Sequence, residues 1–497
     1  MAASQIQKGA IISYVSIFLN IAITFFYTPW MIRQIGVSDY GLYSLTTTFI
    51  SYFILDFGLS GTIQRFIAKY RAEGRKDKIE NMLGLTTKVY LSIDTIIFLV
   101  LFVLYFFLQN IFVGLTAVEV ETLKRLYVIA GLFSVLTFVM HPMNGAMMAY
   151  EYFVETKLLD MVQKVGTVLF IVLVLLLNGS VYELVLITGL TGWLVSLSKY
   201  FVFRRKSRVN IHWRYFNRSE MRMLLAFSMW VFLIGLAQRF RLTIMPSVLG
   251  ITANSTEISI FSLGMTIEAM FFTISSALNG LFLPKVTRLT YQQDRKAINA
   301  LMVRVGRVQL YVISFILFTF FLVGREFLSL WVGELFERSY YIVLLLTGTN
   351  IVSLTQHIGV DIVYAENKVR YTSALTFSTA ILGLLLAVFL SHLYGALGCA
   401  IAVFCSLFTY LILVNRFYAR SLNIDIKGFF QQCHLRVLPY PIVITILFWI
   451  VKTVLPIHSW AGIIFFSVFY AVVFFSIVFL FVLNKEEKGM IRSIIHH

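Results

Sequence analysis

Apolar runs of about 20 residues recur along the whole chain, and no other feature restricts its fold as strongly. Such a run forms a helix about 30 Å long, which matches the hydrocarbon thickness of a bilayer. Hydrophobic residues make up 59% of the 497 residues and charged residues only 13%. Because lipid cannot satisfy backbone polar groups, the spanning segments must be helices or closed barrels, and the alternation typical of barrel strands is absent. The sequence therefore predicts an all-α polytopic membrane protein.

We predict about fourteen transmembrane helices from the lengths of these runs. They cover residues 10–32, 41–64, 82–108, 126–150, 158–177, 184–203, 223–250, 258–283, 308–323, 341–364, 372–391, 396–414, 437–451 and 460–483, and an extension of the ninth span to residue 331 is the alternative. The first run is too long for the core of a signal peptide and is followed by no clear cleavage site. We interpret it as an uncleaved first span.

Lysine and arginine are distributed unequally between the two sides of the predicted membrane. With the N-terminus inside, 31 of the 41 basic residues lie on the cytoplasmic side and six lie outside. The most basic inside segments follow the second, sixth and eighth spans. The positive-inside rule thus predicts a multi-pass membrane protein with both termini in the cytoplasm. This bias also accounts for the net charge of +17, so we expect membrane lipids and no nucleic acid as partners.

The basic segment 204–222 divides the predicted spans into six, six and two. A weak repeat supports this division, since Pro29 and Pro246 each precede a glycine, Gly36 and Gly250, at the outer end of a span. Two parallel six-helix lobes around a central cavity suit transport by alternating access. The predicted parts are an N-terminal lobe 1–203, a linker 204–222, a C-terminal lobe 223–414, a cytoplasmic loop 415–436, two extra helices 437–483 and a tail 484–497.

Motifs of enzymes and nucleotide sites are absent from the sequence. There is no Gly-rich phosphate loop, HExxH or GxSxG pattern, and no cysteine pair has metal-site spacing. The loops between spans are too short to hold a catalytic domain. We therefore expect no enzyme activity, no cofactor and no metal site.

Charged groups at bilayer depth are the strongest functional candidates, because each costs about 2.5–3.5 kcal/mol to insert. Gln238, Arg239 and Arg241 lie near the middle of the seventh span. Residues two apart on a helix point about 200° apart, so the two arginines cannot both face one cavity squarely. We predict that Arg241 faces a ligand, with Arg239 also possible for this role. An internal ion pair with Glu268 of the eighth span is the structural alternative.

The remaining candidates are charged residues in other predicted spans. Asp160 and Lys164 form a favourable i, i+4 pair in the fifth span, although Lys164 could also add positive charge to a lumen. Glu268 is interpreted as a counter-ion or as the carrier of a coupling proton. His357 and Asp361, also i, i+4, are candidates for a proton-linked switch, because histidine titrates near physiological pH. Asp56 and Arg65 lie at the inner half and inner end of the second span, where Arg65 could attract an anionic headgroup.

The first seventy residues carry a recognisable pattern. It comprises Leu19-Asn20, Thr28-Pro29, Ile35-Gly36, Asp39-Tyr40-Gly41-Leu42-Tyr43, Leu55-Asp56-Phe57-Gly58-Leu59, Ile63-Gln64-Arg65-Phe66 and Ala68-Lys69-Tyr70. This pattern resembles the polysaccharide (O-antigen, Wzx-type) flippases of the multidrug/oligosaccharidyl-lipid/polysaccharide exporter superfamily. The resemblance implies two six-helix lobes in a V shape and two further helices that help to form a groove for a lipid tail. The drug-exporting branch commonly has an acidic residue in the first span, where this sequence has the neutral Asn20.

The resemblance implies a flippase of the bacterial cytoplasmic (inner) membrane. It would move an undecaprenyl-pyrophosphate-linked oligosaccharide, the repeat unit of a polysaccharide, from the cytoplasmic to the outer leaflet. Arginine suits the anionic pyrophosphate independently of any resemblance, since its planar fork matches phosphate oxygens. We expect coupling to the membrane potential or to H⁺ or Na⁺, and other polysaccharide-assembly membrane proteins as partners. The rival predictions are a multidrug cation antiporter on the same fold, a membrane glycan polymerase or glycosyltransferase, and an uncoupled lipid scramblase.

Overall fold

The fold is all-helical throughout the part of the chain that the computed structural model describes. That part comprises residues 2–51, 59–222, 224, 235–237, 239–276, 279, 282–484 and 487–488, with the backbone alone for 2–14, 16, 49 and 50. The α-helices are α1 (Ala2–Ile35), α2 (Val37–Ser51), α3 (Leu59–Ala72), α4 (Lys76–Ile111), α5 (Ala117–Phe138), α6 (Pro142–Ala149), α7 (Phe153–Leu176), α8 (Val181–Ser207), α10 (Met245–Thr252), α11 (Ser255–Ser275), α12 (Leu283–Tyr291), α13 (Arg295–Trp331), α14 (Ser339–Gly348), α15 (Asn350–Thr355), α16 (His357–Ala365), α17 (Val369–Ser421), α18 (Ile426–Phe429), α19 (Pro439–Val454) and α20 (Trp460–Ile477). Three short π-helices, η1 (Arg239–Thr243), η3 (Phe430–Leu435) and η4 (Val478–Val482), and one 3₁₀ helix, η2 (Glu334–Arg338), complete them.

The helices confirm a polytopic membrane protein. Among the described residues, nine helical segments are long and apolar enough to cross a bilayer. A tenth arises if Glu334–Thr355 and His357–Ala365, bent by 52° at their junction, count as one broken span. The predicted number of fourteen stays a prediction, because the second and seventh predicted spans run into residues outside the described part.

One predicted boundary differs from the structure. The predicted spans 372–391 and 396–414 fall on the two helical stretches of α17, which meet at Gly395, where φ 56° and ψ −131° are not helical. The end of the predicted ninth span, 308–323, agrees with the predicted extension to residue 331, but the span starts too late, because α13 runs from Arg295 to Trp331. Hydropathy alone could not show this, since the first turns of α13 carry basic residues that resemble a loop.

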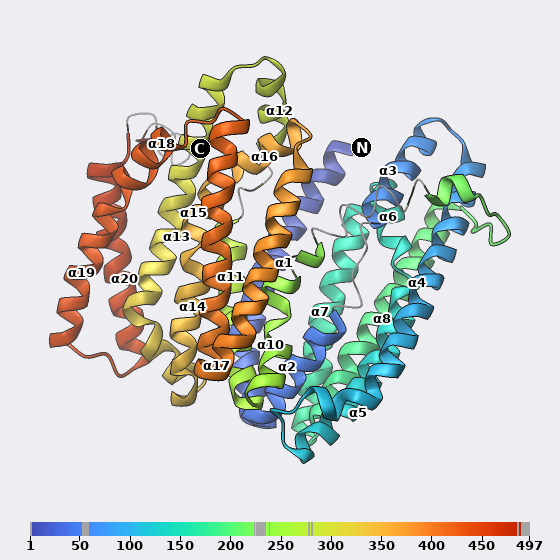
Figure 1. Ribbon diagram of the computed structural model, residues 1–497, viewed down its shortest axis with the longest axis horizontal. Helices are drawn as coiled ribbons and strands as arrows, with labels where there is room; N and C mark the ends of the chain where they lie inside the picture. Colours follow the sequence, from blue (N-terminus) through green and yellow to red (C-terminus); the bar gives the residue numbers. More distant parts are fainter. Residues whose placement is uncertain are drawn as a thin grey trace. The chain divides into compact units, whose positions relative to one another are not determined.

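The described chain forms two compact units. Unit 1 contains residues 1–262 and 388–395, and unit 2 contains residues 263–387 and 396–497. In unit 1, α4, α5 and α8 run side by side, and α7 packs between α1 and α8 (Figure 1). A break near Pro142 separates α5 from α6 within the predicted fourth span, because proline has no backbone N–H to donate to the helix.

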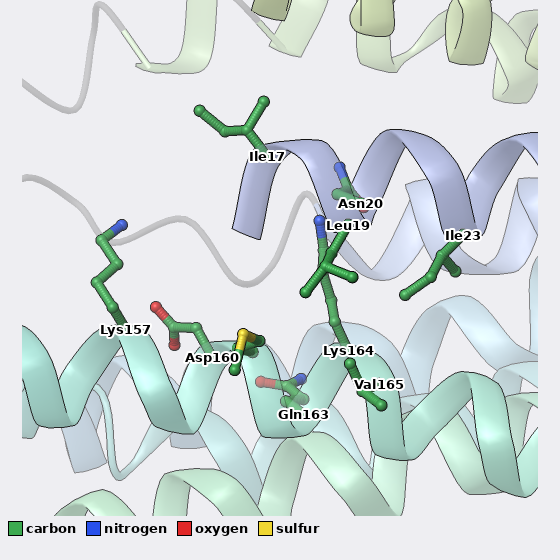
Figure 2. A pocket seen from close by; sticks show the side chains of 10 residues that line it. Ile17, Leu19, Asn20, Ile23, Lys157, Asp160, Gln163, Lys164 and Val165 are labelled. Carbon is green, nitrogen blue, oxygen red and sulfur yellow. The ribbon is translucent and has the colours of Figure 1, made fainter. Parts of the chain in front are cut away.

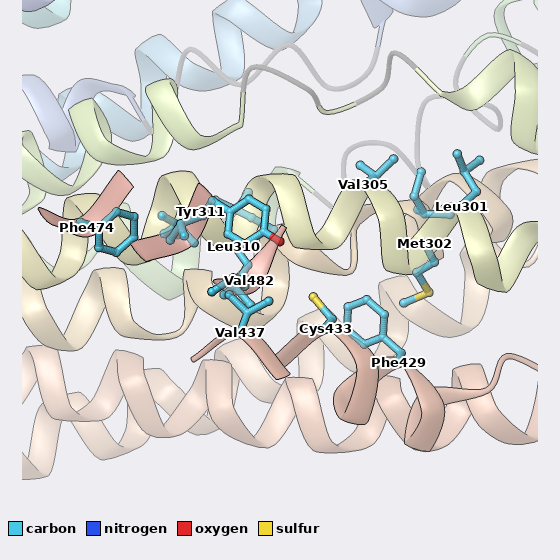
Figure 3. Packing of buried hydrophobic residues seen from close by; sticks show 14 of the residues in the cluster. Leu301, Met302, Val305, Leu310, Tyr311, Phe429, Cys433, Val437, Phe474 and Val482 are labelled. Atoms are coloured by element: carbon cyan, nitrogen blue, oxygen red, sulfur yellow. The ribbon is translucent and has the colours of Figure 1, made fainter. Parts of the chain in front are cut away.

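Unit 2 is organised around the long helix α13. Helices α14, α15, α19 and α20 pack against it, and α19 lies beside α20 (Figure 1). The buried cluster at this centre includes Leu310, Tyr311, Phe429, Cys433 and Phe474 (Figure 3). Large apolar side chains also cover the outside of the helices, for example Phe465 at 74% exposed on α20 and Phe106 at 63% on α4. Such surfaces suit contact with lipid tails rather than with water.

Candidate functional site

A polar pocket lies between α1 and α7 inside unit 1. Its volume is about 430 Å³, and α7 supplies its basic side chains Lys157 and Lys164. Figure 2 shows Lys164 extending from α7 toward the part of α1 that carries Asn20. Gln163 adds an amide, and the apolar wall consists of Ile17, Leu19, Ile23, Met161 and Val165. Because residues seven apart fall on one helix face, the two lysines line the same face, about 10 Å apart along the axis.

The acidic residue of this pocket is already paired. Asp160 accepts a hydrogen bond from the ammonium group of Lys199 on α8, at 2.7 Å, and Lys199 also donates to the Asn144 side chain on α6, at 3.1 Å. The direct ion pair of Asp160 is therefore with Lys199, although Asp160 still interacts electrostatically with Lys164, its predicted i, i+4 partner. Among the described residues, no carboxylate lies within ion-pair distance of Lys157 or Lys164. The pocket thus presents two lysines beside a carboxylate that a third lysine already binds.

The arginines predicted to bind a ligand lie in the π-helix η1. Arg239 donates a hydrogen bond to the hydroxyl of Ser51, the last residue of α2, at 3.0 Å. Arg241 is half-buried. A π-helix closes i→i+5 hydrogen bonds, here from the Ile244 amide to the Arg239 carbonyl at 3.0 Å, and π-bulges often mark functional sites. Gln238 lies outside the described residues.

The predicted coupling residues lie in unit 2. Glu268 on α11 is 9% exposed and accepts a hydrogen bond from the Asn350 side chain at 2.8 Å. His357 and Asp361 come directly after the bend between α15 and α16, and their closest nitrogen and oxygen atoms are 3.9 Å apart. The second carboxylate oxygen of Asp361 is buried and has no hydrogen-bond partner among the described residues.

The last two predicted site residues lie around the second span. Arg65 is exposed on α3 and does not line the α1/α7 pocket. Asp56 lies outside the described residues. The structure therefore brings Lys164 together with Asn20 and places the other described candidates elsewhere.

A second polar cluster joins three helix starts in unit 1, and we call it the serine clasp: Ser38, Glu119, Ser255 and Ser259. The Glu119 carboxylate on α5 accepts hydrogen bonds from Ser38 of α2, at 2.7 Å, and from Ser255 of α11. It also completes the capping box of its own helix with Thr116. Ser259 donates to the carbonyl of Val37 at 2.6 Å.

The helices of the serine clasp approach each other very closely at a glycine. A Cβ atom at Gly41 would lie 2.3 Å from the carbonyl oxygen of Ser255 and 2.7 Å from the hydroxyl of Ser259. Only a residue without a side chain fits between α2 and α11 at this point. The clasp thus depends on one carboxylate and one glycine.

Sequence reasoning missed Lys157, Lys199 and Glu119. From the sequence, Lys157 and Lys199 are basic residues on the cytoplasmic side of the membrane, and Glu119 is a residue of an outside loop. A local signal existed for Glu119, because Thr116 with Glu119 has the capping-box spacing. No local signal existed for the lysines, because the pairing of Lys199 with Asp160 depends on which helices are neighbours. In the described part of the chain, no three His, Cys, Asp or Glu side chains are grouped to hold a metal ion.

Comparisons with known proteins identify a family and a curated relative with a similar sequence. The family described as "Polysaccharide biosynthesis protein" matches residues 6–291, which is more than half of the chain. A curated relative, the uncharacterized membrane protein EpsK of Bacillus subtilis (strain 168), is 21% identical over 490 residues, covering 95% of this chain and 94% of the relative.

Solved structures share the fold at low sequence identity. The lipid II flippase MurJ, in an inward closed conformation, is similar with a TM-score of 0.72 and 12% identity, over 95% of this chain and 98% of MurJ. An inward-facing multidrug resistance transporter of the MATE family has a TM-score of 0.66 and 13% identity, over 76% of this chain and 91% of the transporter. At these identities the likeness concerns the fold alone.

Proposed function

This chain belongs to the polysaccharide biosynthesis protein family, and from that premise we propose that it is a flippase for a lipid-linked oligosaccharide with an anionic pyrophosphate. Its family makes it a membrane transporter and not an enzyme. The substrate would be a polysaccharide repeat unit on a polyprenyl carrier, moved from the cytoplasmic to the outer leaflet of the bacterial cytoplasmic membrane. Both termini would lie in the cytoplasm, as the distribution of basic residues indicates.

The α1/α7 pocket carries this proposal. Among the described residues, no carboxylate lies within ion-pair distance of its two lysines, and ammonium groups bind phosphate well as point charges. Asn20 and Gln163 can donate to and accept from sugar hydroxyls. At about 430 Å³, the pocket suits a pyrophosphate and an adjoining sugar rather than a whole repeat unit. A cationic drug is disfavoured, because the lining has two lysines and one carboxylate, and that carboxylate is already bound by Lys199.

Membrane potential supplies a driving force without a nucleotide. Outward movement of a negative charge releases about 2.3 kcal/mol per charge at 100 mV, inside negative. Ion coupling is a further part of the proposal. Glu268, His357, Asp361 and Asp56 are its candidates, and Glu268 is favoured because its carboxylate is buried with a neutral partner, Asn350. Arg239 and Arg241 remain proposed contacts of the pyrophosphate farther along its path, and Arg65 and Gln238 are weaker candidates.

Alternating access requires a barrier that opens, and we assign this role to the serine clasp. Ser38, Glu119 and Ser255 follow the first, third and seventh predicted spans, and Ser259 lies at the start of the eighth, so the predicted orientation puts the clasp on the outer side. Its hydrogen bonds join helix ends through hydroxyl groups and one carboxylate. Such bonds can exchange for water when the helices part, because the net gain of each over water is small.

The test is a flipping assay in liposomes with a labelled undecaprenyl-pyrophosphate oligosaccharide, read out by an added glycan hydrolase. We expect Lys164→Gln and Lys157→Gln each to lower the initial rate about tenfold, and an inside-negative potential to accelerate the wild type. Lys296→Gln is the matched control, because Lys296 is exposed and lies outside the pocket.

Equal rates in the pocket variants and the control would remove the pocket from the pathway. A folded wild type that flips none of several lipid-linked glycans, yet exports cationic drugs from liposomes, would overturn the flippase proposal in favour of the antiporter.

A further inference from the structure

Part of the predicted linker is fixed to unit 1, and we propose that it binds an anionic phospholipid of the cytoplasmic leaflet. We call residues 208–216, which follow α8, the linker strap. The predicted orientation puts this segment, between the sixth and seventh spans, on the cytoplasmic side. The strap shares no residue with the α1/α7 pocket, so the proposal is independent of the transported substrate.

Backbone contacts hold the strap against the first turns of α4. The His212 amide donates to the Glu80 carbonyl at 3.2 Å. A Cβ atom at Gly84 would lie 2.1 Å from the His212 carbonyl oxygen, so only glycine permits this close approach. Farther along, Lys88 donates to the Tyr215 carbonyl at 3.1 Å. The strap therefore presents its outward side chains in a fixed arrangement.

These contacts place the strap where α4 enters the membrane. The predicted span on α4 begins at Met82, and Lys88 lies six residues later, about 9 Å farther along the helix axis. Phe216 of the strap lies beside this lysine, whose ammonium nitrogen is 6.0 Å from the centre of the Phe216 ring. The strap thus runs at the level where headgroups meet acyl chains, which is the level at which amphipathic aromatic rings concentrate.

The side chains that the strap turns outward are aromatic and basic. Trp213 is 53% and Phe216 is 59% exposed, and Arg214 between them is also exposed. Large exposed rings leave apolar area unburied in water, whereas a bilayer surface covers that area and attracts the neighbouring cations. This combination favours lipid as the occupant of the exposed face.

A pocket behind the strap offers a place for one headgroup. Its volume is about 220 Å³, and it lies between the strap, α8 and α6. Arg204 is the one charged side chain among the described residues that line it. The other lining residues are Met143, Tyr200, Phe203, Val209, Asn210, Ile211 and Trp213. An arginine fork above apolar walls suits a phosphodiester that continues into a glycerol backbone and acyl chains.

This arginine is available for a ligand. Its side chain is exposed and has no ion-pair partner among the described residues. The carboxylates that contact the strap or the end of α8 already have bonded partners: Glu80 with Lys76 and His212, Glu155 with Lys206, and Glu220 with the Tyr215 hydroxyl. A soluble phosphate would use the arginine and leave the strap's rings in water, whereas a phospholipid contacts both. Basic pockets on the cytoplasmic side are typical sites for anionic headgroups.

Native mass spectrometry of the full-length protein in detergent tests the site, with phosphatidylglycerol as the probe and phosphatidylcholine as the neutral comparison. We expect one phosphatidylglycerol to bind more tightly than the rest and more tightly than phosphatidylcholine. Arg204→Gln and Trp213→Ala should each weaken its binding about fivefold.

Two matched variants serve as controls. Arg205→Gln removes the neighbouring exposed arginine of α8, which does not line the pocket. Trp449→Ala removes a tryptophan of α19 that is 52% exposed, nearly the same as Trp213. All four side chains are exposed, so the variants should fold like the wild type.

Weaker binding in the two strap variants alone supports the lipid site. Equal weakening in strap and control variants would show unspecific attraction and would overturn the proposal. Equal binding of the two lipids, or the absence of a tight lipid in the folded wild type, would overturn it as well. Displacement of the tight lipid by millimolar inorganic phosphate would also overturn it, because the site would then be one for a soluble anion.

Discussion

The buried ion pair between Arg307 on α13 and Glu487, whose closest atoms are 2.8 Å apart, should make the segment after η4 energetically dependent on that helix. We consider three variants: Arg307→Met, Glu487→Gln and the two combined. Arg307→Met removes five hydrogen bonds and leaves a buried carboxylate without its cation, with hydrogen bonds from the Asn484 amide and the Tyr311 hydroxyl. Loss of one partner of a buried pair costs about 3–5 kcal/mol of unfolding free energy.

Glu487→Gln should cost less. The guanidinium keeps three acceptors, namely Val482, Gln432 and Tyr311, so the loss is that of charge-assisted bonds, about 1.5–3 kcal/mol. In the double variant neither charge remains, and Met can pack against Tyr311 and Cys433. Its cost should therefore be no larger than that of Arg307→Met alone. The coupling energy of the cycle should be at least about 2 kcal/mol.

Reversible unfolding in mixed micelles, followed by tryptophan fluorescence, would measure the four free energies. Arg288→Met serves as the control for loss of an exposed charge and should change the unfolding free energy by less than about 0.5 kcal/mol. A coupling energy below about 0.5 kcal/mol would refute the reasoning. It would mean that the two side chains contribute independently and that the segment is held by its apolar contacts.

Two further predictions concern other parts of the chain. Gly41→Ala should lower the unfolding free energy by about 1–3 kcal/mol, because the new Cβ would lie 2.3 Å from the backbone oxygen of Ser255. The control is Gly61→Ala on α3, where the space is open, and it should raise the unfolding free energy by up to about 1 kcal/mol. Equal effects of the two substitutions in thermal unfolding would contradict the close approach of α2 and α11. Glu366, between α16 and α17, accepts from Arg295 at 2.5 Å and Lys368 at 2.8 Å, and these bonds outweigh burial and hold its pKa below the ordinary value. Its contribution of about 1 kcal/mol is present above the unfolded-state pKa and is lost as the pH falls through the lower folded-state pKa. The melting temperatures of wild type and Glu366→Gln should therefore differ at pH 7 and converge in acid, and a gap that persists at pH 3 would disprove this linkage.

Within the site, the predicted role of Lys164 in ligand binding stays a prediction, and the direct ion pair of its neighbour Asp160 differs from the predicted one. The i, i+4 rule considers one helix at a time, so it joined Asp160 to Lys164. The structure joins Asp160 to Lys199 at 2.7 Å, because α7 packs against α8. The predicted contrast between Arg239 and Arg241 likewise assumed an α-helix, and the structure has a π-helix there.

The sequence by itself determined that the chain is an all-α membrane protein of the exporter type. A window of about 20 residues is enough to recognise a span, because each span must form all its backbone hydrogen bonds within itself in lipid. Only the tertiary structure decided that Arg307 is buried with Glu487, 180 residues away, rather than exposed in a basic loop. It also decided that the start of α11 approaches α2 so closely at Gly41 that no side chain fits there. These contacts depend on the rotation and neighbours of whole helices, which no local window of sequence contains.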